Sequence, residues 1–183
     1  MTGIDDVFSQ IEPELSIGDT IPINTIKVVV EEWANAIIEK IMDKNLYPEL
    51  QAQTIHNRML RDINLIGSDY PLLETGEWVS FIEFRITREN DGYKVETGVW
   101  ENNTLIGHTR DRTPEDIAYM NEYGWDESAI PARNLFTITQ MEIEERLNSI
   151  LQLSETDYFT DKETLIGHLV ADGASLKLVW VEE

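Results

Sequence analysis

The sequence predicts an α+β fold in which a small antiparallel sheet packs against two long helices, with acidic extensions at the N- and C-terminal ends. Three observations lead to this prediction. Apolar residues recur at helical spacing in residues 24–45 and 134–151, which predicts two long amphipathic helices. Between residues 78 and 99 the period changes to two, which is typical of strands with one polar face. The segments before residue 24 and after residue 151 are rich in acidic residues.

These features divide the chain of 183 residues into three parts. We expect an acidic N-terminal arm (1–23), an α+β domain (24–151) and a C-terminal extension that ends in a strand (152–183). The chain is long enough, and at 42% hydrophobic residues apolar enough, to bury a core of its own. Within the arm, the apolar spacing over residues 4–11 permits a short docked helix, and a mobile arm is the equal alternative.

The first long helix is predicted from about Asn24 to Asn45, with Asn24 or Thr25 as its N-cap. Its apolar face is formed by Ile26, Val29, Val30, Trp33, Ile37 and Ile41. Pro48 suits the first turn of a second helix, which we expect to run to about Ile63. The turn-forming residues at 67–71 end this helical region.

An antiparallel hairpin is predicted next. Apolar residues at 82, 84 and 86 alternate with charged ones, and a second alternating run covers residues 93–99. The residues between them, Asn90-Asp91-Gly92, are a hairpin turn signal. Residues 104–109 are a candidate third strand that follows this hairpin.

Two more helices and a strand complete the prediction. Thr113-Pro114 starts a short helix with a cap and a proline at its first position, and Gly124 stops that helix. The second long helix, from about Asn134 to Leu151, has an apolar stripe formed by Phe136, Ile143, Leu147 and Ile150. Alternation over residues 176–180 predicts a final strand.

The charge balance excludes several classes of function. Fourteen Lys and Arg face 35 Asp and Glu, for a net charge of -21. Nucleic-acid binding depends on clustered basic residues that neutralise phosphates, so this balance argues against it and against an anionic membrane surface. No long apolar run predicts a transmembrane helix, and the N-terminus lacks the basic start of a signal peptide. Without Cys, we expect synthesis in the cytosol and neither disulfides nor cysteine-based metal sites.

Catalytic motifs are not recognisable in the sequence. The three His residues, at 56, 108 and 168, form no metal-binding pattern, and the glycines form no phosphate-binding loop. Carboxylate pairs suited to glycoside hydrolysis can be drawn from any chain this acidic, so they are better explained as solvated faces. We therefore expect no catalytic, cofactor or metal site.

Three segments, in this order, carry a family resemblance. They are Pro71–Gly76 (PLLETG), Ile117–Gly124 (IAYMNEYG) and Ile130–Phe136 (IPARNLF), which opens a helix. Together with the preceding long helix, they resemble the phage neck and tail-completion proteins of the HK97 gp10-like and virion-morphogenesis group, which includes the minor tail protein Z type. The resemblance covers about residues 24–151. The chain departs from the family pattern at Asn134, where the family has a second proline.

The resemblance implies a structural virion protein of a tailed bacteriophage, made in the host cytoplasm and without enzymatic activity. It implies a homo-oligomeric ring, expected to be a hexamer, that acts in tail completion or head–tail joining at the neck or at the head-proximal end of the tail tube. The implied partners are further copies of the chain, a tail terminator or tail tube protein, and connector or head-completion proteins. Genome DNA would pass through without specific binding, and no membrane would be involved. The implied structural or interface residues are Thr75, Gly76, Tyr123, Gly124, Pro131, Arg133 and Phe136.

Two other functions remain open at this point. An acidic DNA mimic that occupies the groove of a DNA-binding protein is consistent with the charge, although the three motifs do not predict it. A hydrolase with paired carboxylates is the remaining alternative, and only the abundance of acids supports it.

Overall fold

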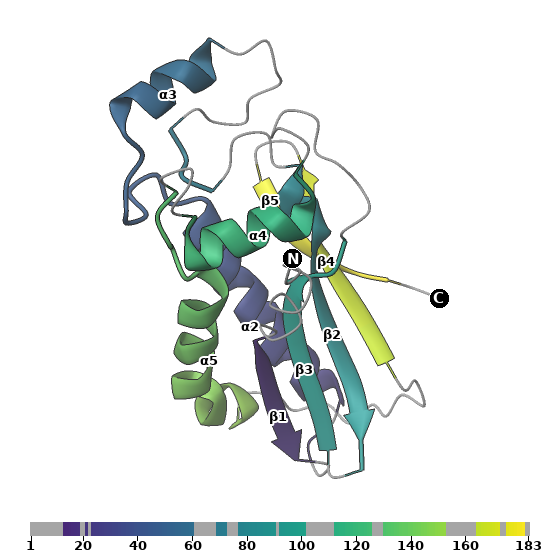
Figure 1. Cartoon of the computed structure of the whole chain (residues 1–183). Coiled ribbons are helices and arrows are strands. Elements are labelled where there is room, and N and C mark those ends of the chain that lie inside the picture. The colour runs from purple at the N-terminus through teal and green to yellow at the C-terminus, as the bar shows by residue number, and fades with distance from the viewer. Residues whose placement is uncertain are drawn as a thin grey trace, which may run out of the picture.

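The computed structural model describes residues 13–18, 21, 23–60, 69–72, 77–90, 92–101, 112–125, 130–152, 164–172 and 175–181. It confirms the predicted α+β class, since helices accompany a five-stranded sheet in which every pair of neighbours is antiparallel. The strands are β1 (Glu14–Gly18), β2 (Ile82–Glu89), β3 (Gly92–Val99), β4 (Thr164–Asp172) and β5 (Ser175–Trp180). Their order across the sheet is β1-β3-β2-β4-β5 (Figure 1).

The central strands β2 and β3 form the predicted hairpin. Their register places Phe84 opposite Thr97 and Ile86 opposite Val95, so the apolar residues share one face. That face is completed by Leu15 and other apolar side chains of β1, β4 and β5. Period-two alternation therefore predicted this part of the sheet correctly, since one face is buried and the other is polar.

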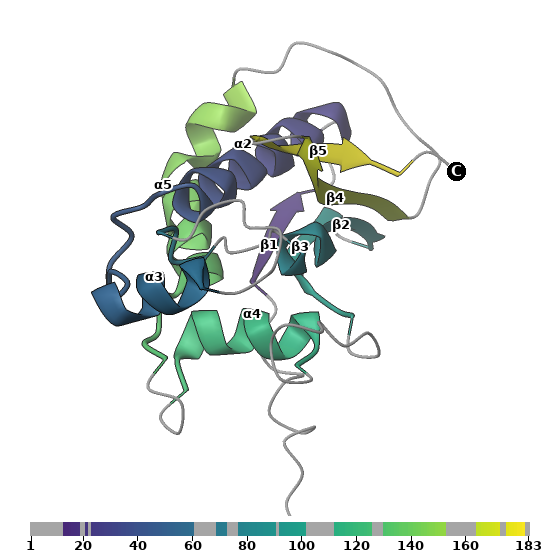
Figure 2. The same ribbon diagram turned by 90° about the horizontal axis from the view of Figure 1, so that it is seen from above.

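The inner face of the sheet packs on helix α2 (Ile23–Ile41), which also packs on helix α5 (Leu135–Gln152). Figure 2 shows α2 lying between α5 on one side and β4 and β5 on the other. All six residues of its predicted apolar stripe are fully buried. In α5, three residues of the predicted stripe are buried, and Leu147 is half-buried against the same core.

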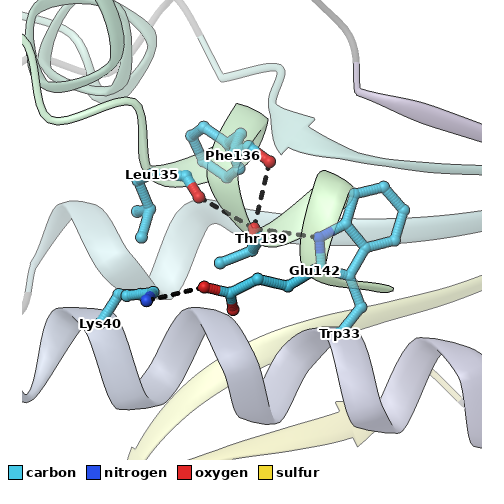
Figure 3. Close-up of polar contacts among 6 residues, drawn as sticks. All are labelled: Trp33, Lys40, Leu135, Phe136, Thr139 and Glu142. Carbon is cyan, nitrogen blue, oxygen red and sulfur yellow. Dashed lines mark hydrogen bonds and ion pairs between the residues drawn. The ribbon is translucent and has the colours of Figure 1, made fainter. Parts of the chain in front are cut away.

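One buried hydrogen bond joins the two long helices (Figure 3). The indole Nε1 of Trp33 donates to the hydroxyl of Thr139 over 3.1 Å. That hydroxyl donates in turn to the carbonyl of Leu135, 2.8 Å away. Close by, Lys40 and Glu142 form an ion pair of 2.8 Å that is partly exposed. The buried hydrogen bond fixes how α2 and α5 face each other, whereas the partly exposed ion pair contributes little.

The first helical region differs from its prediction. Helix α2 ends at Ile41 rather than near Asn45, because the chain turns there and the Asn45 amide donates to the side chain of Asp43. The next helix, α3, spans only Ala52–Met59. Pro48 follows a cis peptide bond and lies before this helix, not in its first turn.

Both ends of the described chain contribute strands to the sheet. Strand β1 lies within the predicted N-terminal arm and pairs with β3. Strand β4 lies within the predicted C-terminal extension and pairs with β2, while β5 is the strand expected there. The candidate helix over residues 4–11 and the candidate strand over residues 104–109 lie outside the described residues.

Candidate functional site

Helix α4 (Pro114–Tyr123) carries the second motif and begins as the sequence predicts. Thr113 accepts a hydrogen bond from the Asp116 amide, and the Asp116 carboxylate accepts one from the Thr113 amide. This reciprocal capping box, with proline in the first turn, fixes the start of the helix. A 3₁₀ turn, η1 (Trp78–Phe81), packs beside it.

Gly124 ends α4 in a conformation that only glycine adopts readily, with φ 80° and ψ 174°. A Cβ atom at this position would lie 2.8 Å from the amide nitrogen of Ala132 and 2.9 Å from the carbonyl oxygen of Ile130. The predicted helix stop is thus confirmed, and the glycine also allows two backbone segments to come into close contact.

Residues 121–125 and 130–137 form what we call the α4–α5 corner. The amides of Trp125 and Ile130 each donate to the other's carbonyl. Two further backbone bonds run from Arg133 to the carbonyl of Asn121 and from Asn134 to that of Glu122, at 2.8 and 3.1 Å. The end of one helix is therefore bonded directly to the approach to the next.

Glu122 closes the corner and is 2% exposed. Its two carboxylate oxygens accept from the amides of Phe136 and Thr137 at 2.7 and 2.9 Å, and one also accepts from the Thr137 hydroxyl. These amides belong to the first turn of α5, so a side chain from α4 caps α5. The sequence analysis did not select Glu122 as a site residue, although this residue lies within the second motif.

Most of the predicted motif residues meet at this corner. Phe136 is buried in the core, Pro131 is exposed on the approach to α5, and Tyr123 is 39% exposed. The Tyr123 ring lies 5.0 Å from that of Tyr119. Burial, followed by the nearby Glu122 carboxylate, raises the pKa of Tyr123 to about 12. Thr75 and Gly76, from the first motif, lie outside the described residues.

Arg133 lies inside the protein, with 5% of its surface exposed. Its Nη2 donates to the carbonyl of Pro48 over 3.2 Å, while its buried Nε has no hydrogen-bond partner. Burial and the positive charge of Arg58 lower the pKa of Arg133. No carboxylate among the described residues pairs with it, which is unusual for a buried cation.

The outer face of the sheet carries a second group of charges. Lys94 lies between Glu14 and Glu96, at 3.1 and 2.6 Å, and the two carboxylates raise its pKa. Arg85 pairs with Glu83, and its guanidinium carbon lies 3.8 Å from the centre of the Trp100 ring. These basic side chains are therefore neutralised by neighbouring acids.

Two features concern metal binding and membrane crossing among the described residues. No group of His, Asp or Glu among them has an arrangement that could hold a metal ion. No helix within that part of the chain combines the length and apolar character needed to cross a bilayer.

The α4–α5 corner is therefore a rigid junction between two helices, and it is built from internal hydrogen bonds. Comparisons of the chain with models of protein families, with curated proteins and with solved structures give no match.

Proposed function

We propose that this chain is a structural protein of a tailed-phage virion. It would form a homo-oligomeric ring at the head–tail neck or at the head-proximal end of the tail tube. The observation that carries the proposal is the α4–α5 corner, where the second and third motifs of the resemblance meet. In the corner, Gly124 allows a close backbone contact and Phe136 anchors α5 in the core.

The charge of the chain supports a place on the path of the genome. DNA must pass the ring without adhering, and a lining of net negative charge repels phosphate. On the outer face of the sheet, Lys94 and Arg85 are both neutralised by acids, so that face offers few unpaired positive charges to DNA. From the net charge of -21 we expect the lumen of the ring to be acidic.

A nonsense allele in the phage genome that encodes the chain tests the proposal. Electron microscopy of the lysate is expected to show full heads separate from finished tails, or joined particles that do not infect. Supplying the wild-type chain from a plasmid is the control and restores infectious particles. Infectious particles of normal form without the chain would refute the proposal.

The net charge also favours the second candidate, an acidic decoy for a DNA-binding protein. This function predicts inhibition of a nuclease or repressor at low salt that fades as salt rises, since such binding depends on charge. The ring proposal predicts no such inhibition, so the same purified protein distinguishes the two.

A further inference from the structure

Strand β5 lies at one end of the sheet, so only one of its two edges pairs with a described strand, β4. Directly after β5, the Val181 amide donates to the Ile166 carbonyl of β4 over 2.8 Å. Because bonded and non-bonded pairs alternate along an antiparallel ladder, this bond fixes the direction of every backbone group in β5. Alternate residues, starting from Val179, point toward β4. The residues between them point their amides and carbonyls away from the sheet: Leu176, Leu178 and Trp180.

The outer edge of β5 is open. No described residue bonds to the amides or carbonyls of Leu176, Leu178 and Trp180. Natural proteins block such edges with prolines, bulges or charges, because an open edge is a template for another strand. Strand β5 contains no proline, its register with β4 is regular, and Lys177 is its one charged residue.

The opposite edge of the sheet, formed by β1, is partly closed by the chain itself. The outward carbonyl of Glu14 accepts a hydrogen bond from Nε2 of Gln140 in α5, at 3.0 Å. The outward carbonyl of Gly18 accepts one from the Ile21 amide, at 3.2 Å. Ser16 lies between them and points its amide in the same direction. Of the two edges, β5 is therefore the one that can accept a further strand.

The open edge is complementary to a second copy of itself. When two β5 strands lie antiparallel with Leu178 opposite Leu178 of the second copy, Leu176 lies opposite Trp180. All three residues point their backbone groups outward, so each amide meets a carbonyl of the other copy. Their half-buried side chains share the inner face of the sheet, so apolar residues meet across the contact. On the outer face, Lys177 lies opposite Val179, and no two lysines are directly opposed.

The distribution of charge favours the same edge. Two copies of a chain with a net charge of -21 repel each other, so a contact between them needs a stretch that is poor in acids. Each of the other four strands carries at least one acidic residue, whereas β5 carries none, and the two terminal glutamates follow the stretch that would pair. Lys27 adds a positive charge nearby, since its Nζ lies 5.1 Å from the centre of the Trp180 ring.

We infer that two copies of the chain join through antiparallel pairing of their β5 strands into one continuous sheet. The contact runs from Leu176 to Trp180 in each copy and bonds every outward amide and carbonyl of this stretch. Adding a strand to an open edge is a common way for proteins to bind each other. A contact between two identical surfaces is complete with two copies. The inference is therefore independent of the proposed ring, which needs contacts between different surfaces.

Cysteine pairing on the outer face of β5 tests both the contact and its register, because the chain has no Cys of its own. Lys177→Cys and Val179→Cys proteins, carrying tags of different size, are mixed and oxidised mildly. These two positions are directly opposite each other in the inferred register. We expect about tenfold more mixed disulfide than from a control mixture of Lys177→Cys with Val181→Cys, since disulfides form only between closely placed residues. Val181 lies on the same face, two residues further along, and is 41% exposed. Equal yields from the two mixtures would overturn the inference.

A proline at the edge tests the contact without cysteines. Leu178→Pro removes an amide that points away from β4, so the sheet should still form. It should weaken dimerisation about tenfold, as measured by sedimentation equilibrium, because each copy loses a hydrogen bond to the other. Ser16→Pro is the matched control, since it removes an outward amide from the opposite edge and should leave dimerisation unchanged.

Should Leu178→Pro fail to fold, the cysteine mixtures still decide, because their substitutions lie on the outer face of the sheet. Unchanged dimerisation of a folded Leu178→Pro protein would refute the inference. A wild-type chain that sediments as a monomer would refute it as well, and would leave the open edge to a strand of another protein.

The two proposals fail separately. A harmless nonsense allele would refute the virion function whatever the β5 strands do. A monomeric chain that is still essential for infectious particles would keep the virion function and remove the β5 contact.

Discussion

A methyl group added at Gly124 is expected to destabilise the protein strongly. The residue has φ 80° and ψ 174°, and forcing alanine into such a backbone costs about 1–3 kcal/mol. The new Cβ would also lie 2.8 and 2.9 Å from backbone atoms of Ala132 and Ile130, which a flexible side chain cannot relieve by moving. Overpacking of this kind adds about 1–3 kcal/mol. We therefore expect Gly124→Ala to lower the free energy of unfolding by about 2–6 kcal/mol.

Urea unfolding followed by Trp fluorescence and circular dichroism measures this loss. For a domain of this size, a loss near 3 kcal/mol corresponds to a fall in melting temperature of about 6–12 °C. Gly18→Ala is the matched control, because a Cβ at Gly18 has no atom within 4 Å, and its effect should stay within about 0.5 kcal/mol. A Gly124→Ala protein as stable as the Gly18→Ala protein would show that this account of the α4–α5 corner is wrong.

Three further predictions concern buried polar groups. Thr139→Val should cost about 1–3 kcal/mol in urea unfolding, because it leaves the buried Trp33 indole N–H without its acceptor. Lys40→Met is the control and should cost less than about 1 kcal/mol, because it breaks only a partly exposed ion pair. Equal costs would contradict this prediction. Glu122→Gln should cost about 1–3 kcal/mol in the same assay, because an amide cannot accept from both the Phe136 and Thr137 amides, and Glu39→Gln on the exposed face of α2 is its control. Stability should fall as pH rises from about 10 to about 12, because over that range Tyr123 ionises in the unfolded chain but stays protonated in the folded one. Tyr123→Phe should make this fall smaller, and an unchanged pH profile of unfolding would contradict the assigned pKa.

Local periodicity predicted the elements that form the centre of the fold. In α2, residues such as Val29, Val30 and Ile37 lie on one stripe, and all are fully buried. The β2–β3 hairpin was predicted by alternation and by a strong turn signal, both of which depend only on neighbouring residues. Such patterns can be recognised in a sequence because the physical cause is local.

Strand β1 was missed although its pattern is present. Leu15 and Ile17 are buried and alternate with exposed residues, but the strand has only five residues, begins directly after Pro13 and ends at Gly18. So short a strand is stable only because β3 pairs with it, and that partner is remote in the sequence. The order of the strands could not be predicted for the same reason.

The candidate site was predicted in part. The helix stop at Gly124 and the buried Phe136 follow from residue type and position. The role of Glu122 could not be predicted from residue type and position, because the two amides that it caps lie beyond a separate turn of the chain. Buried Arg133 donates to the carbonyl of Pro48, which belongs to a distant loop. No local sequence pattern therefore predicts that Arg133 is buried.

The topology of the sheet determines when during synthesis the fold can be completed. Leu15 pairs with Val95, and Ile86 pairs with Leu165, so strands on both sides of the central hairpin join it over long stretches of chain. Until β4 and β5 leave the ribosome, one edge of β2 and one side of α2 stay uncovered. Nascent chains that stop before residue 164 would therefore expose an unpaired strand and a bare apolar helix face, both of which promote aggregation. In the full-length chain, β4 and β5 are synthesised last of the strands, and they then cover this edge of β2 and this side of α2.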